Sequence, residues 1–147
     1  MIDSANEVLA DAVRDVLETM FFTCVYAEIP GGDAEGGIEI RLPFTGQRQG
    51  EFRLGLSQRA ARSVAAGFLG VEEEGQLSAE QIGDVACEVA NMICGSALSR
   101  LEANLAFNLQ PPLPVQASGR AGPPEFAMRA FDLGNGTLTV GIRFDQS

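Results

Sequence analysis

The sequence predicts an α+β fold, in which a six-stranded and mostly antiparallel sheet packs against helices. Two long segments repeat apolar residues at helical spacings of three and four, and shorter segments alternate apolar and polar residues as half-buried strands do. The expected order is helix, three strands, short helix, long helix and three strands, so a unit of one helix and three strands occurs twice. We expect residues 1–147 to form one domain, long enough to bury its own core.

Composition excludes several classes of function. The chain has 20 acidic and 10 basic residues, a net charge of −10, which argues against nucleic acid or an anionic membrane as the main partner. It has no histidine, and its three cysteines, Cys24, Cys87 and Cys94, form no Cys-x-x-Cys pair. These facts remove most zinc sites and most nucleophilic systems that need histidine. We expect the cysteines to be buried or inert thiols.

The N-terminus lacks the features of a secretory signal, because Met1–Ser4 has neither a basic nor an apolar region. No apolar run approaches the roughly 18 residues of a membrane span. We therefore expect a cytoplasmic protein.

The first expected helix has about 17 residues and begins at a capping box of Ser4 and Glu7. Its core-facing positions are Val8, Leu9, Ala12, Val13, Val16, Leu17 and Met20. At Phe21–Tyr26 the sequence changes to residues that favour strands. Turns are expected at 30–33 and 35–37, where glycine is frequent.

Two strands and a short helix follow. Apolar residues alternate with charged ones in Ile38–Phe44 and again in Glu51–Leu56, which is typical of half-buried strands. Ser57 is the expected cap of a helix that continues to about Leu69. Residues 70–75, with three consecutive glutamates, form an expected acidic loop in which solvent exposure is the ordinary reading.

A long helix in Ser78–Phe107 organises the rest of the chain. Ser78 and Gln81 form its capping box, and Leu77 with Ile82 can form a hydrophobic staple around it. Its expected apolar stripe is Ile82, Val85, Ala86, Val89, Met92, Ile93, Ala97, Leu101 and Leu105.

The same helix carries a second, polar stripe. Asp84, Glu88 and Asn91 are separated by four and three residues, so they occupy a sector about 60° wide, and Gly95 continues it. Such a stripe is ordinarily a solvated face. Gly95 favours another reading, because a mid-helix glycine costs about 1 kcal/mol relative to alanine and leaves bare backbone that a partner can approach. A kink or a packing accommodation explains Gly95 equally well.

The remaining elements are strands. Pro111, Pro112 and Pro114 prevent the helix from continuing and lead to an expected strand near Val115–Ser118. A loop follows at 119–124. Strands at 126–133 and 137–144 are joined by Gly134-Asn135-Gly136, which is a hairpin signal.

The polar stripe resembles the active-site pattern of a known family. Asp84-x-x-x-Glu88-x-x-Asn91, followed after 22 intervening residues by Pro114, is similar to the pattern of the CheC/CheX/FliY family of chemotaxis phosphatases. The resemblance covers most of the chain and implies an internally duplicated fold. It also implies a substrate, the phosphorylated aspartate of a CheY-like response regulator, and a reaction, the hydrolysis of that acyl phosphate.

The duplication can be tested on the first helix, because some family members carry a second active helix there. The comparable run is Asp11-x-x-x-Asp15-x-x-Glu18, with Arg41 lying 23 residues beyond Glu18. A carboxylate stands where the pattern has a carboxamide, and arginine stands where it has proline. We therefore expect a single site, as in CheX-like members.

The resemblance assigns roles to individual residues. Asn91 would position the attacking water, since a carboxamide can both accept and donate hydrogen bonds. Glu88 would dock on a lysine of the partner, and Asp84 would orient the helix or the interface. Pro114 would shape the chain beneath the site. Mg²⁺ would be held by the response regulator, because two carboxylates four residues apart on one helix make a poor magnesium site, and this chain would bind no cofactor.

A second hypothesis is a non-catalytic module that binds a receiver domain or a flagellar-switch-like partner. Intact Glu88 and Asn91 favour the enzyme. A general small-molecule hydrolase is disfavoured, since the chain lacks histidine and a nucleophile constellation. CheX-like relatives suggest a homodimer, for which a strand edge is the expected interface.

Overall fold

Seven strands form one sheet, and two of them share an edge position. The computed structural model describes residues 2–21, 23–29, 37–72, 76–101, 106–116 and 127–145. The helices are α1 (Ile2–Met20), α2 (Gln58–Leu69) and α3 (Ala79–Leu101). The strands are β1 (Ala27–Ile29), β2 (Ile38–Gly46), β3 (Gly50–Leu56), β4 (Phe107–Leu109), β5 (Leu113–Gln116), β6 (Ala127–Asp132) and β7 (Thr137–Phe144).

The strand order has an internal twofold symmetry. The sheet runs β1-β6-β7-β3-β2-β4, with β5 also paired to β2, and every pairing is antiparallel. Exchanging β1 with β4/β5, β2 with β6 and β3 with β7 reverses this order and leaves it otherwise unchanged. The sheet therefore has six strand positions, and the predicted α+β fold with a repeated helix-and-three-strands unit is confirmed.

The edge formed by β4 and β5 changes register between them. Phe44 pairs with Leu109 in β4, whereas Arg41 pairs with Leu113 in β5, so the edge contains one residue more than β2 opposite it. Pro111 and Pro112 lie at this change and donate no backbone hydrogen bond. The extra residue lies at the edge of the sheet, where no further strand has to pair with it.

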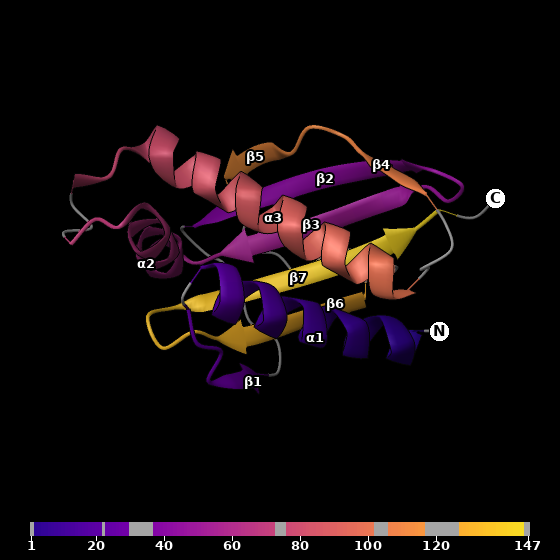
Figure 1. Cartoon of the computed structure of the whole chain (residues 1–147), viewed down its shortest axis with the longest axis horizontal. Coiled ribbons are helices and arrows are strands. Elements are labelled where there is room, and N and C mark those ends of the chain that lie inside the picture. The colour runs from indigo at the N-terminus through magenta and orange to yellow at the C-terminus, as the bar shows by residue number, and fades with distance from the viewer. Residues whose placement is uncertain are drawn as a thin grey trace.

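Both long helices lie on one face of the sheet (Figure 1), where α1 contacts α3 and α3 contacts β2 and β3. Strand residues that point to this face are buried, such as Leu42, Leu54 and Val140. The core also takes apolar residues from the helices, among them Leu9, Val13, Leu17, Val64, Val89, Ile93 and Leu98.

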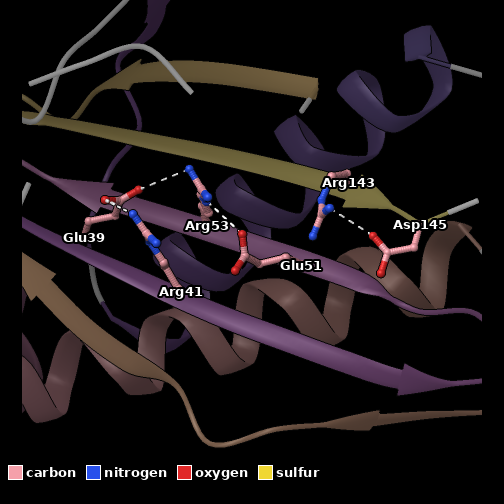
Figure 2. Close-up of polar contacts among 6 residues, drawn as sticks. All are labelled: Glu39, Arg41, Glu51, Arg53, Arg143 and Asp145. Carbon is pink, nitrogen blue, oxygen red and sulfur yellow. Dashed lines mark hydrogen bonds and ion pairs between the residues drawn. The ribbon is translucent and has the colours of Figure 1, made fainter. Parts of the chain in front are cut away.

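The opposite face carries charged residues that alternate with the core residues. Figure 2 shows Arg53 of β3 between two glutamates, 2.9 Å from Glu51 and 3.9 Å from Glu39. Arg143 pairs with Asp145 at 3.0 Å. Because the pair of Arg53 and Glu39 connects β3 to β2, it helps to hold this face in the register that buries the other one.

Local capping predictions are confirmed. The Ser78 N–H donates to Gln81 Oε1 at 2.8 Å and the Gln81 N–H donates to Ser78 Oγ at 3.1 Å, which is the predicted capping box. The Ser57 hydroxyl accepts from the Ala60 N–H, and α2 ends at Leu69 as predicted. The hairpin between β6 and β7 is also present, and its Gly134 and Gly136 have the positive φ angles that favour glycine.

Several boundaries were predicted wrongly. The long helix ends at Leu101, and Phe107 begins β4, a strand that the sequence pattern did not separate from the helix. Ser4 lies inside α1, since this helix already begins at Ile2. The residues of Phe21–Tyr26 that the structure describes form no strand, and β1 starts at Ala27.

The buried face of α3 is wider than the predicted stripe. Ala90, Cys94 and Leu98 are buried as well, whereas Leu101 is only half-buried. The reason is that α3 packs against α1 and α2 in addition to the sheet, so more of its circumference is covered. On α1, the predicted core residue Met20 is exposed.

Some predictions lie outside the described residues. They are the turns at 30–36, residues 73–75 of the acidic loop, Leu105, and residues 117–126, which include the predicted end of one strand and the loop after it.

We expect truncation of α3 to distinguish its fully buried positions from its margin. Ile93 is fully buried, so Ile93→Ala should lower the free energy of unfolding by about 2–5 kcal/mol. Leu101→Ala should cost clearly less, because Leu101 keeps part of its solvent contact. Denaturant unfolding of both variants measures the difference, and equal costs would show that the burial of the helix has been misassigned.

Candidate active site on helix α3

Helix α3 presents the polar stripe from a firmly held position. The opposite side of the helix is buried against the sheet and both other helices. Its first turn is fixed by the Ser78–Gln81 capping box. The direction in which the stripe points is therefore set by the core and not by the stripe residues themselves.

The stripe residues lie away from the buried side of the helix. Asp84 and Glu88 are exposed, and Asn91 and Gly95 are half-buried. Within the described ranges, the side chains of Asp84, Glu88 and Asn91 make no hydrogen bond or ion pair. Exposed carboxylates and a carboxamide without internal partners remain available to bind a second molecule.

Gly95 is not required by the packing of this chain. A Cβ atom built on Gly95 would meet nothing within 4 Å, so there is room for a side chain. Gly83 on the same helix is similar, since its Cβ would lie 3.9 Å from Ile38 Cδ1, an ordinary contact. Tight packing within the described residues therefore does not account for the helix-weakening glycine on the polar stripe.

The thiol of Cys87 lies beside the stripe carboxylates. Burial raises the pKa of Cys87, and the negative charges of Asp84 and Glu88 raise it further. Burial also raises the pKa of Cys94, which lies in the core, to about 12. Cys94 is buried and Cys87 is half-buried with a raised pKa, which agrees with the expectation of buried or inert thiols. Cys24 is exposed and so was not predicted correctly as a buried thiol.

Pro114 lies in β5 opposite Ile40 of β2, and β5 is among the strands that α3 contacts. An edge strand is the part of a sheet that tolerates proline. The structure thus brings the segment containing Pro114 next to the helix that carries Glu88 and Asn91.

The corresponding stripe on α1 is used within the chain. Asp15 accepts a hydrogen bond from Arg100 of α3 at 3.0 Å, and Glu18 accepts from the Val25 N–H at 3.5 Å. No local pattern in the sequence indicated this role for Arg100, because the pairing depends on α1 and α3 lying side by side. Two of the three acidic residues of the α1 stripe therefore have structural partners, whereas those of α3 have none among the described residues.

Metal-ligating residues do not cluster in the described part of the chain, where no group of three or more acidic or cysteine residues is arranged to hold an ion. Among the helices described, none has the length and apolar character needed to cross a membrane.

Solved structures of CheC-like proteins have this fold. CheX from Vibrio vulnificus is 21% identical, with a TM-score of 0.75 over 95% of each chain. CheX from Desulfovibrio desulfuricans is 22% identical, with a TM-score of 0.75 over 96% of this chain and 99% of that one. CheX from Borrelia burgdorferi, in a complex with CheY, BeF₃ and Mg²⁺, is 20% identical, with a TM-score of 0.73 over 95% and 97%. The chain thus shares the fold of these proteins over almost its whole length.

Its family is given by the sequence. The family model of the chemotaxis phosphatase CheX matches residues 39–124, more than half of the chain, and includes α3 and β5. The chain belongs to the CheX chemotaxis phosphatase family. A comparison with curated proteins found no match.

We expect the three cysteines to differ in reactivity at pH 8. Cys24 should be alkylated first and Cys94 last, with Cys87 slow because its raised pKa leaves little thiolate. Glu88→Gln removes one of the charges that raise this pKa and should accelerate labelling of Cys87 alone. Mass spectrometry after timed iodoacetamide treatment measures all three rates. An unchanged Cys87 rate would argue against an effect of Glu88 on that thiol.

Proposed function

We propose that this protein is a phosphatase that hydrolyses the aspartyl phosphate of a CheY-like response regulator. The observation that carries this proposal is the pair Glu88 and Asn91, which point outward from a firmly packed helix without partners in the described chain. Membership of the CheX phosphatase family supports the same activity. The Borrelia complex of CheX with CheY supports this class of partner.

Asn91 positions the attacking water. Phosphoryl transfer needs little covalent chemistry from the protein, and catalysis comes from alignment and charge stabilisation. The carboxamide oxygen of Asn91 can accept a hydrogen bond from water, while its NH₂ group can donate to a phosphoryl oxygen. A carboxylate in this position would repel the phosphoryl group.

Glu88 docks the helix on the partner. It lies one turn before Asn91 on the same stripe and is exposed, so its carboxylate can pair with a lysine of the receiver domain. Asp84, one further turn away, orients the same interface. Water exclusion on binding strengthens the Glu88 pair and fixes the position of Asn91 relative to the phosphoryl group.

Gly95 and Pro114 shape the contact without taking part in the chemistry. The absence of a side chain at Gly95 lets the partner approach the backbone of α3 one turn beyond Asn91. Pro114 stiffens the edge strand beside the helix, since its ring fixes φ. Mg²⁺ belongs to the response regulator, as the composition of the Borrelia complex suggests, and this chain contributes the polar side chains.

We also propose that the protein is a homodimer, as the resemblance to CheX-like proteins implied. The competing function, a module that binds a receiver without hydrolysis, makes a different prediction for the Asn91 variant and is tested by the same assay.

We expect Asn91→Ala to lower the rate of dephosphorylation of a phosphorylated receiver by about 100-fold or more, because water alignment is lost in the transition state. Binding to the receiver carrying BeF₃ should change little. Phosphate release and titration calorimetry measure the two effects separately. A wild-type protein that binds phosphorylated receivers but never accelerates phosphate loss would leave only the binding module.

Glu88→Ala should act mainly on binding. It removes a docking charge, so the affinity for the receiver should fall, and the salt dependence of binding should become weaker. Glu18→Ala on α1 is the matched control and should leave turnover nearly unchanged. Affinities measured at two salt concentrations test this, and a Glu88 variant with wild-type affinity would contradict the docking role.

Gly95→Ala should separate stability from function. The substitution meets no atom within 4 Å and should stabilise the protein by up to about 1 kcal/mol, yet weaken receiver binding by placing a methyl group in the interface. Gly83→Ala should give a similar stabilisation with binding unchanged. Thermal unfolding measures the stability of both variants, and titration with the receiver measures their affinity. Equal affinities for the two would remove Gly95 from the interface.

A further inference from the structure

Arg100 connects the helix that carries the candidate site to α1 through two hydrogen bonds. Its Nε donates to Ser96 Oγ, one turn earlier on α3, at 3.2 Å. Its Nη2 donates to Asp15 Oδ2 of α1 at 3.0 Å. A planar guanidinium can hold both acceptors at once, because its N–H groups point in fixed directions. We call Asp15, Ser96 and Arg100 the α1–α3 clamp.

The clamp lies in the turn of α3 that follows the polar stripe. Ser96 comes directly after Gly95, and Arg100 is the only basic residue of this helix. In an α-helix the Gly95 N–H donates to the Asn91 carbonyl, four residues earlier. The backbone turn that begins at Asn91 is therefore closed by Gly95, and the clamp holds the residue immediately after it.

Gly95 makes this turn a weak point of the helix. Glycine leaves the helical conformation more readily than other residues, because it has no side chain to limit its backbone angles. A Cβ atom built at Gly95 would meet nothing within 4 Å, so the described surroundings do not restrain the turn by close packing at this position. The clamp supplies a restraint from outside the helix, since Asp15 belongs to α1. Figure 1 shows α1 and α3 side by side on the same face of the sheet.

We infer that Arg100 is a positioning residue for Asn91. By tying Ser96 to Asp15, it holds the turn after Gly95 in helical geometry, so the Asn91 carboxamide keeps the direction that water alignment needs. The inference rests on the proposed function and deepens it, because it assigns a role to residues that do not touch the phosphoryl group. A misplacement of about 1 Å at a reacting group can lower a rate about 100-fold, so a weak surface contact can have a large effect on turnover.

The clamp also gives a use to the acidic run of the first helix. In Asp11-x-x-x-Asp15-x-x-Glu18, Asp15 occupies the place that Glu88 has in the run on α3. Glu88 is exposed and makes no ion pair with a described residue, whereas Asp15 binds Arg100. The half of the fold that lacks the carboxamide thus supports the half that has it.

A contribution to global stability explains the clamp less well. The side chains of Arg100 and Asp15 are 40% and 57% exposed, and ion pairs with such exposure contribute little, because water and salt screen them. The two helices are already held together by the buried apolar residues of the core, among them Val13 and Ile93. Loss of the clamp should therefore change the local motion of α3 more than the free energy of global unfolding.

Hydrogen exchange of the full chain tests the clamp independently of activity. Arg100→Met and Asp15→Ala should each accelerate exchange of the amides of residues 95–99 about fivefold or more, and the double variant should exchange no faster than either alone. Gly95→Ala added to Arg100→Met should restore most of the protection, because alanine favours the helix. The matched control is Arg129→Gln, which removes an ion pair between β6 and β1 and should leave these amides unchanged. Thermal unfolding checks that each variant is folded.

Kinetics with phosphorylated CheY-like receivers tests the consequence for the site. Arg100→Met should lower kcat for phosphate release about 10-fold and change KM less than about twofold, because alignment is lost while the docking charge of Glu88 remains. Arg129→Gln should keep both constants at the wild-type values.

The two measurements separate the possible failures. Unchanged exchange at residues 95–99 in Arg100→Met and Asp15→Ala would overturn the clamp. Faster exchange with an unchanged kcat in an active enzyme would overturn its role in positioning Asn91. A wild type that accelerates phosphate loss from no receiver would remove the proposed function, and with it the positioning role, even where exchange shows that the clamp restrains the helix.

Discussion

The burial of one side of α3 is the constraint on which the site depends. A helix has one rotational phase, and the apolar residues of α3 fix it against the sheet, α1 and α2. Turning the helix by about 100°, so that Glu88 takes the place of the buried Val89, would push its carboxylate into the core, which is costly without a partner. The outward direction of Glu88 and Asn91 is thus determined by the residues on the buried side of the helix.

The two halves of the twofold sheet differ in how their helices use polar residues. On α1, Asp15 and Glu18 are committed to Arg100 and to the Val25 N–H. These contacts stabilise the packing of α1 on its neighbours, but they use the acidic groups that would otherwise face a partner. The residues that lie 23 positions beyond Glu18 and beyond Asn91 also do not correspond in the sheet. Arg41 is in β2, which the symmetry relates to β6, whereas Pro114 is in β5.

Features encoded in a few neighbouring residues could be predicted from the sequence. The Ser78–Gln81 capping box, the Ser57 cap, the glycine turn after β6 and the polar stripe all follow from spacing along the chain. Features that depend on packing could not. The burial of Leu98 requires α1 or α2 beside α3, and the ion pair of Arg100 joins residues that are 85 positions apart. The helix end at Leu101 and the separate strand β4 were missed because the apolar spacing continues into Leu105 and Phe107.

The register change between β4 and β5 bears on how such a chain can vary. One extra residue at an edge shifts the side-chain alternation of β5 relative to β4, but it does not disturb β2, which keeps a single register with β3 throughout. Removing one residue at Pro111–Pro112 would give the two short strands a common register and still leave Pro114 opposite Ile40. Insertions and deletions of single residues can therefore be absorbed at this edge during evolution, while the helix that carries the polar stripe stays where it is.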